Sequence, residues 1–441
     1  MFFVKKTVCT SFVCIAFALS AMPHATDYYT HADAASVPAD ERVLSPFREE
    51  QPANYVVLTW PEQLPAVQYE LELSATAAID NNTPLPDAAQ QIRGIFVNGT
   101  ILNLAGWTEK RLFFRARPLD RYGAPIGPFT PPKRIRINHN LTVPVRPIPH
   151  SELYSYDAPA PLYPTYSWIP VPGAASYELE VTTVPPASVT DLGPDPYRLY
   201  GAIIPKGMIE YYDWEPKRIA GTYYWRVRAL DEDGEPLGIW SDASSYTIDT
   251  TPGGIASFGD SITHGGGGLS YGPSDPAFSY QNYLSFPCLN LGRSGDTSET
   301  MLARFEEDIL PFSPKYLIIL GGSNSLRGGT PAEQVISELT QIGEKCRKHG
   351  IRPIFLTLPP INPEYIQLAF QEGTVEDWQV RFAIVNAFIR RQRYFIDIAP
   401  AMTDENGLLP TSLSLDGIHP DAPGKQIMAD IINRNWTRVT R

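Results

Sequence analysis

The chain has 441 residues, and at about 150 residues per domain this length predicts roughly three domains. It is 43% hydrophobic and 19% charged, and 48 acidic residues outnumber 36 basic ones, which argues against a disordered polyelectrolyte and against a nucleic-acid partner. Its 43 prolines and its aromatic content of 11% indicate short strands separated by turns over much of the chain.

Residues 1–25 have the features of a secretory signal peptide. Two lysines precede an apolar run over residues 7–18, and small residues follow at candidate cleavage sites after Ser20 or Ala25. The run is shorter than the ~20 residues that a membrane-spanning helix needs, and no later segment reaches that length. We therefore predict a secreted protein (extracellular, periplasmic or at the cell surface) with no transmembrane segment in the mature chain.

Two of the four cysteines lie in this peptide, which leaves Cys288 and Cys346 in the mature chain. They could form one disulfide after export or stay as two free buried thiols, and the sequence leaves both alternatives open. Metal-ligand patterns such as CxxC and HExxH do not occur, so we expect no metal site.

An internal repeat organises the middle of the chain. WPEQLPAVQYELE begins at Trp60 and WIPVPGAASYELE begins at Trp168, 108 residues later. FRARPLDRYGAPIGPF begins at Phe114 and WRVRALDEDGEPLGIW at Trp225, an offset of 111 that implies a three-residue insertion between the blocks. Apolar and polar residues alternate within the blocks, which is the period of a half-buried strand.

Each copy fits a small antiparallel β-sandwich, which we predict over residues 45–142 and 160–250. Both copies, the second more clearly through TYYWRVRALDEDGEPLGIWSDA, resemble fibronectin type III-like domains of secreted bacterial proteins. A spacer or positioning role is favoured for them, and contact with a glycan or a cell surface is the alternative. The Pro-rich segment Val143 to Pro164 is expected to be a stiff connection between the two.

The pattern changes in residues 251–441, where short apolar runs alternate with segments of helical spacing. The apolar runs predict five strands, Gly254–Phe258, Cys288–Leu291, Tyr316–Leu320, Pro353–Leu358 and Tyr394–Ile398. The helical segments are Thr297–Ile309, Pro331–His349, Val380–Arg391 and Gly424–Trp436. This alternation predicts a five-stranded parallel sheet covered on both faces, with a ligand site beyond the carboxyl ends of its strands.

Residues just after these runs include the groups that acyl transfer requires. Ser261 follows the first run, and Asp416 and His419 follow the last. A serine hydroxyl becomes a good nucleophile only when a base removes its proton, an imidazole can do so at neutral pH, and a carboxylate can hold that ring in place. We therefore interpret these three residues as a candidate catalytic set, with Asp260 serving the turn.

The segments FGDSI, NLGRSGDTS, LGGSNSLRG and DGIHP resemble the four sequence blocks of the SGNH (GDSL) hydrolases, in the same order. The resemblance covers essentially all of residues 251–441 and is nearest to the bacterial lysophospholipase, thioesterase and arylesterase branch. It implies a three-layer, flavodoxin-like α/β fold in which Ser261 is the nucleophile, His419 the base and Asp416 the residue that orients the base.

The resemblance also implies an oxyanion hole with three donors, namely the N–H groups of Ser261 and Gly295 and the side-chain amide of Asn324. Gly292 is the alternative for the second donor. The third block reads GSNS where the family usually has GxND, and an ungapped reading would place Ser323 at the asparagine position. We choose Asn324 because an amide N–H reaches farther and donates better than a hydroxyl that can rotate away.

The function implied is that of a secreted serine esterase for acyl or acetyl esters of a small molecule or a polysaccharide, without a metal or an organic cofactor. We expect residues 265–268 to leave the mouth of the site open and flexible, and His264 to line the pocket. The segment Pro359 to Trp378 is expected to form an aromatic wall that contains Tyr365, Phe370 and Trp378. The alternative function is a secreted glycan- or surface-binding protein with an inactive hydrolase-like domain.

Overall fold

The computed structural model describes residues 50–52, 54–63, 66–77, 80–85, 90–108, 111–150, 160–207, 210–248, 254–267 and 273–441. The predicted signal peptide lies outside these residues. Below, residues 50–138 are called the first β-region, residues 148–248 the second β-region and residues 254–441 the α/β region.

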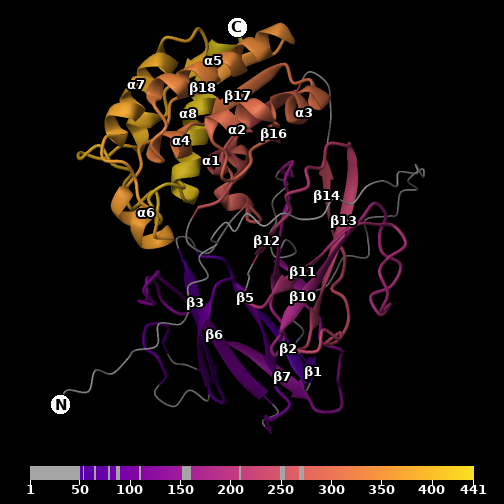
Figure 1. Ribbon diagram of the computed structural model, residues 1–441. Helices are drawn as coiled ribbons and strands as arrows, with labels where there is room; N and C mark the ends of the chain where they lie inside the picture. Colours follow the sequence, from indigo (N-terminus) through magenta and orange to yellow (C-terminus); the bar gives the residue numbers. More distant parts are fainter. Residues whose placement is uncertain are drawn as a thin grey trace, which may run out of the picture. The chain divides into compact units, whose positions relative to one another are not determined.

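The first β-region consists of two sheets that enclose one core (Figure 1). Its strands are β1 (Glu50–Pro52), β2 (Tyr55–Thr59), β3 (Gln68–Ser74), β4 (Gln90–Ile95), β5 (Gly99–Asn103), β6 (Arg111–Leu119) and β7 (Lys133–Asn138). One sheet has the order β1-β7-β6-β3-β4 and the other pairs β2 with β5. All pairs are antiparallel except β1 with β7, so the predicted antiparallel architecture is confirmed.

The second β-region repeats this plan with strands β8 (Ile148–Pro149), β9 (Thr165–Ile169), β10 (Ser176–Thr182), β11 (Arg198–Pro205), β12 (Glu210–Tyr212), β13 (Gly221–Leu230) and β14 (Ser244–Ile248). Its sheets have the orders β11-β10-β13-β14 and β12-β9-β8. Strand β8 lies in the segment that we expected to be only a connection, and it pairs with β9 at Ile169 and Trp168. The Pro-rich segment therefore contributes an edge strand, a position that proline tolerates.

The sequence repeat corresponds to repeated contacts. The rings of Trp60 and Tyr69 lie 5.5 Å apart in the first copy, and those of Trp168 and Tyr177 lie 5.2 Å apart in the second. In both copies the tyrosine hydroxyl accepts a hydrogen bond from a backbone N–H six residues upstream. The two copies thus share one packing scheme.

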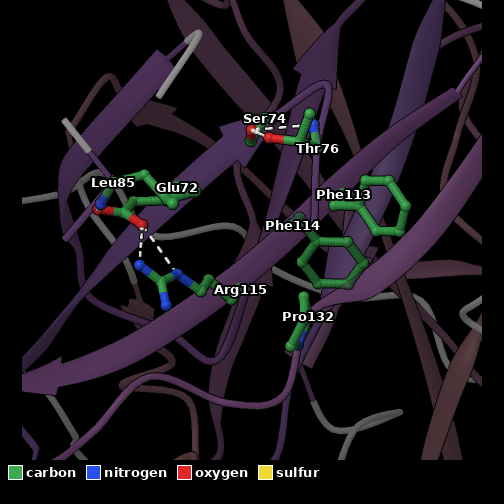
Figure 2. A pocket seen from close by; sticks show the side chains of 8 residues that line it. All are labelled: Glu72, Ser74, Thr76, Leu85, Phe113, Phe114, Arg115 and Pro132. Carbon is green, nitrogen blue, oxygen red and sulfur yellow. Dashed lines mark hydrogen bonds and ion pairs between the residues drawn. The ribbon is translucent and has the colours of Figure 1, made fainter. Parts of the chain in front are cut away.

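Each β-region also buries ion pairs between neighbouring strands. Arg115 of β6 binds Glu72 of β3, and Figure 2 shows this pair in a small hollow beside Phe114 and Pro132. Arg226 of β13 binds Glu180 of β10 in the equivalent place. All four of these charged residues are at most 2% exposed.

The α/β region contains five parallel strands, β15 (Ile255–Gly259), β16 (Leu289–Asn290), β17 (Tyr316–Leu320), β18 (Arg352–Leu356) and β19 (Phe395–Ile396). Their order is β16-β15-β17-β18-β19, which in chain order within this region is the flavodoxin-like 2-1-3-4-5 arrangement. The five predicted strands and the parallel sheet are confirmed. Helices pack around this sheet in Figure 1, with α5 beside α2 and α7.

Three of the predicted helices are α5 (Ala332–Lys348), α7 (Trp378–Arg390) and α8 (Ala422–Thr440). The fourth is divided into α2 (Ser298–Ala303) and α3 (Phe305–Ile309), with Arg304 between them at φ −89° and ψ 4°. The remaining helices are α1 (Ser261–His264), α4 (Ser323–Arg327) and α6 (Pro363–Phe370), and the 3₁₀ turns are η2 (Pro276–Phe278), η3 (Tyr280–Tyr283), η4 (Leu310–Phe312) and η5 (Ala399–Met402).

Cys288 and Cys346 are two separate buried thiols, so the alternative of free thiols describes this structure. Burial raises the pKa of each thiol to about 12, which keeps both protonated at neutral pH. Across the part of the chain that the structure describes, no helix combines the length and the apolar character that crossing a membrane requires.

Candidate active site

The candidate nucleophile lies directly after the central strand β15. Asp260 caps helix α1, and its Oδ1 atom accepts the N–H of Ile262 at 3.0 Å. Ser261 is the first residue of α1, so its own N–H has no acceptor within the helix, and no other partner for it exists among the described residues. A Cβ atom at Gly259 would collide with the Leu320 carbonyl, so only glycine fits where the chain turns into the helix.

His419 lies between Ser261 and Asp416. Its Nε2 atom is 2.8 Å from Ser261 Oγ, and its Nδ1 atom is 2.8 Å from Asp416 Oδ2. Because the carboxylate can only accept, Nδ1 carries the proton and Nε2 is free to accept the serine proton. The imidazole is therefore held in the tautomer that a general base needs.

The Asp416 carboxyl is held in its ionised form. Burial by itself would raise its pKa, but the His419 charge and the hydrogen bonds from His419 and Ile418 outweigh burial and place the pKa below its ordinary value. Oδ1 accepts the N–H groups of Ile418 at 2.9 Å and His419 at 2.8 Å. These bonds also fix the carboxylate relative to the imidazole ring.

Of the two candidate glycines, Gly295 has the backbone that is available to a ligand. It is exposed, its φ of 80° favours glycine, and its N–H has no partner among the residues described. The N–H of Gly292, by contrast, donates to Asn290 Oδ1 at 3.0 Å, and Gly292 packs against the backbone of His264. Gly295 therefore remains the candidate for the second oxyanion donor, and Gly292 the alternative with the less available N–H.

Asn324 and Ser323 also differ in whether their side chains are available to a ligand. Asn324 is partly exposed and its Nδ2 donates to the carbonyl of Asp296 at 3.0 Å, which leaves the second amide hydrogen free to donate. Ser323 is 1% exposed, and its Oγ has no hydrogen-bond partner within the described structure. This environment favours Asn324 as the amide donor and a buried, structural place for Ser323.

Two expectations for the mouth of the site are wrong. His264 does not line a pocket: it is fully buried and hydrogen-bonded at both ring nitrogens. Residues 265–267 are buried rather than open, and a Cβ atom at Gly267 would meet the Pro420 carbonyl and the Phe278 ring. These glycines permit close packing, whereas Gly268 lies outside the described residues.

The expected aromatic wall is present only in part. The ring of Phe370 lies edge-on to His419, with centroids 5.9 Å apart. Tyr365 is half-buried, and Arg121 of the first β-region lies 5.9 Å from its ring centroid. Trp378 is buried against Phe382 and belongs to the core.

Sequence reasoning missed a buried lysine next to the helix that begins at the candidate nucleophile. Lys425 of α8 is fully buried and donates from Nζ to the carbonyl of Ile262 at 2.6 Å. Burial lowers its pKa to about 7, and burial raises the pKa of nearby Asp260 to about 6. A lysine at a buried position within the amphipathic pattern of residues 424–436 is the signal that could have identified it.

Sequence reasoning also missed Arg304. Its guanidinium donates to the carbonyls of Gly259 at 3.1 Å and Leu291 at 3.0 Å, and to Asp296 at 2.5 Å. It therefore ties together the ends of β15 and β16, from which Ser261 and the candidate oxyanion loop (residues 292–296) extend. No group of three or more acidic, histidine or cysteine residues able to hold a metal ion occurs in the described portions of the chain.

Comparison with known proteins places this region among acylhydrolases. Residues 257–427 match the GDSL-like lipase/acylhydrolase family. The lipoprotein YqeF of Bacillus subtilis is 35% identical over 119 residues, which are 24% of this chain and 49% of that protein. Thioesterase 1/protease 1/lysophospholipase L1 of Escherichia coli is 25% identical over 143 residues, 32% of this chain and 63% of that protein.

Solved structures match part of the chain. A GDSL-like lipase from Bacteroides thetaiotaomicron is 22% identical with a TM-score of 0.33, over 42% of this chain and 87% of that one. A catalytic mutant of an acetylxylan esterase from Geobacillus stearothermophilus is 19% identical with a TM-score of 0.32, over 42% and 95% of the two chains. The matched segments span about half to two thirds of the length of the two curated relatives. Residues 257–427 of this chain thus form a domain of the GDSL-like lipase/acylhydrolase family.

Proposed function

We propose that this protein is a serine esterase that hydrolyses carboxylic esters of acyl or acetyl groups. The observation that carries the proposal is the hydrogen-bond chain from Asp416 through His419 to Ser261, in which both contacts are 2.8 Å long. Membership of residues 257–427 in an acylhydrolase family supports the same reaction class.

The reaction proceeds in two steps. His419 Nε2 takes the proton of Ser261 Oγ as that oxygen attacks the ester carbonyl, and the N–H groups of Ser261 and Gly295 and the Asn324 amide stabilise the oxyanion. His419 then protonates the departing alcohol as the carbon–oxygen bond of the ester breaks. A water molecule, deprotonated by the same imidazole, then attacks the acyl carbonyl. The bond to Ser261 Oγ breaks, His419 returns the proton to that oxygen, and the acid leaves.

The substitution Ser261→Ala tests this assignment directly. We expect hydrolysis of a short-chain p-nitrophenyl ester to fall by roughly 10⁴-fold or more, because no other group supplies the nucleophile. A fluorophosphonate probe should label the wild-type protein and not the variant, with circular dichroism showing that both are folded. A wild-type protein that the probe does not label would instead favour a binding protein with an inactive hydrolase-like domain.

Asn324→Ala and Ser323→Ala form a matched pair for the third donor. We expect Asn324→Ala to lower kcat by about 10²- to 10³-fold, the usual loss when one oxyanion donor is removed. Ser323→Ala should leave kcat within a few-fold of wild type because its hydroxyl is buried and unpartnered among the described residues. A larger loss from Ser323→Ala than from Asn324→Ala would reverse the assignment.

We also propose that the protein is exported from the cytoplasm. The basic and apolar pattern of residues 1–25 supports a cleaved signal peptide, and the match to a protein named as a lipoprotein agrees with a location outside the cytoplasm. The mass of the mature chain recovered from outside the cell would identify the cleavage site. The fibronectin type III-like assignment of the two β-regions and their contact with a glycan or cell surface stay predictions, as does the choice between a small-molecule and a polysaccharide ester.

A further inference from the structure

The second β-region reaches the oxyanion loop through a tyrosine. Tyr212, at the end of β12, accepts a hydrogen bond from the backbone N–H of Ser294 at 2.9 Å, and its hydroxyl lies 2.8 Å from His264 Nδ1. Ser294 is the residue before Gly295, and His264 lies three residues after Ser261. One hydroxyl from another part of the chain therefore contacts both sides of the candidate oxyanion hole.

The directions of these hydrogen bonds follow from the chemistry of the groups. His264 Nε2 is 2.7 Å from the carbonyl of Tyr163, which can only accept, so Nε2 carries the hydrogen. Burial lowers the pKa of His264 to about 3, so the ring is neutral and Nδ1 is an acceptor. Two hydroxyls lie within reach of Nδ1, that of Tyr212 at 2.8 Å and that of Ser294 at 3.0 Å. With either as the donor, the Tyr212 oxygen accepts the Ser294 N–H.

A second chain of hydrogen bonds leads from the same β-region to Asp296, on the other side of Gly295 in the candidate oxyanion loop. Asp308 is fully buried and accepts from the Tyr163 hydroxyl at 2.6 Å and from Arg218 Nε at 2.9 Å. It also accepts from Arg304 Nη1 at 3.0 Å, and Arg304 Nε binds Asp296 at 2.5 Å. Asp296 follows Gly295 directly, and its carbonyl holds the Asn324 amide.

We propose that Tyr212 is a positioning residue for ester hydrolysis, which makes the second β-region part of the active site rather than a spacer. Through the Ser294 N–H it fixes the backbone that presents the Gly295 N–H to the oxyanion. This inference rests on the proposed function. Fixed donors stabilise a developing charge only when their geometry is set beforehand, so a loosened Gly295 should slow the chemical step more than it weakens substrate binding.

Tyr212→Phe removes the hydroxyl and keeps the ring, which stacks on Trp214 at 4.2 Å and packs on the edge of His264. We expect kcat per active site to fall about 10- to 100-fold for a p-nitrophenyl ester, with KM within about twofold of wild type. Active sites are counted by complete labelling with a fluorophosphonate, so a misfolded fraction does not contribute. The acid limb of the pH profile of kcat/KM should stay unchanged, since His419 and Asp416 keep their contacts.

Tyr211→Phe is the matched control. Its hydroxyl bonds to Tyr200 within the second β-region, so the same chemical change one residue away leaves the oxyanion loop untouched. We expect kcat per labelled site to equal that of wild type. Should Tyr212→Phe fail to fold, Arg218→Gln tests the second connection, with an expected loss of about 3- to 10-fold in kcat.

The outcomes separate the two proposals. If the wild-type protein neither hydrolyses the ester nor reacts with the fluorophosphonate, the proposed function fails. If the wild-type protein is active but Tyr212→Phe, or Arg218→Gln in its place, has the same kcat per labelled site as Tyr211→Phe, only the positioning role of the second β-region is overturned.

Discussion

The two β-regions have cores of the same design, but they differ in the contacts that they make with the rest of the chain. In the first, Arg115 and Arg117 lie over the ring of Phe129 at 4.0 and 4.4 Å. In the second, Arg226 and Arg228 both lie over the ring of Trp240 at 4.4 Å. Paired glutamates, Trp–Tyr contacts and turns recur with them, so the repeat preserves the interactions that hold each sandwich together.

The two copies differ on the strand that follows the three-residue insertion, which is β5 in the first β-region and β12 in the second. In the first β-region Ile101 pairs with Val57, and at the equivalent register position of the second Tyr212 pairs with Thr165. Ile101 is 3% exposed and belongs to a hydrophobic cluster, whereas the Tyr212 hydroxyl bonds to the α/β region. At this position the second copy contacts the α/β region, whereas the first copy reaches that region elsewhere, through Arg121, which donates to the Leu415 carbonyl at 2.7 Å.

Substitution of the buried arginines should reveal the largest difference in stability between the two cores. Arg115→Ala should lower the free energy of unfolding by about 3–5 kcal/mol, because the donors that remain for Glu72 among the described residues, Gln91 and the Leu85 N–H at 3.2 Å, are neutral. Arg226→Ala should cost less, about 2–3 kcal/mol, because Arg198 remains 3.4 Å from Glu180. Urea unfolding followed by tryptophan fluorescence measures both.

Adding Glu72→Gln to Arg115→Ala should recover part of the loss, because the unpaired buried charge is then removed. Equal losses in the two single variants would mean that the Arg198 contact contributes no stability. The two cores would then be equivalent in energy as well as in structure.

The sequence predicted the parts of the molecule that depend on local pattern. Alternating residues located the repeat, and apolar runs located the five strands of the α/β region within a few residues. Ser261, Asp416 and His419 could be placed together because parallel strands present their carboxyl ends at one edge of the sheet. This argument needs only strand order and the residues that follow each strand.

Features that depend on packing between distant segments could not be predicted. The helical spacing of residues 297–309 gave no indication that Arg304 would interrupt the helix, since its acceptors are carbonyls of Gly259 and Leu291. His264 was expected at the pocket because it is near Ser261, but its partners Tyr163 and Tyr212 come from the second β-region. When the two copies are aligned by strand register, Tyr212 stands where the first copy has Ile101. This difference is the signal that could have identified the contact.

Two buried histidines extend the comparison to acid stability. His150 binds Asn98 of the first β-region at 2.8 Å, whereas His264 joins the second β-region to the α/β region. Burial lowers the pKa of each to about 3, against 6.5 when unfolded. Between these values the unfolded state binds the extra proton, so their contribution is complete above pH 6.5 and is lost as the pH falls toward 3, by up to about 1.4 kcal/mol per pH unit for each histidine.

His150→Gln and His264→Gln should each reduce the slope of unfolding free energy against pH between 6 and 4 by up to about 1.4 kcal/mol per pH unit, measured from urea unfolding curves. Their effects on catalysis should differ. At pH 7, kcat per labelled site should fall in His264→Gln, because the imidazole that holds the Tyr212 hydroxyl at 2.8 Å is replaced by a flexible amide, and should stay unchanged in His150→Gln. Equal losses of kcat in both variants would mean that the contact between the two β-regions supports the oxyanion loop as directly as the contact of the second β-region with the α/β region.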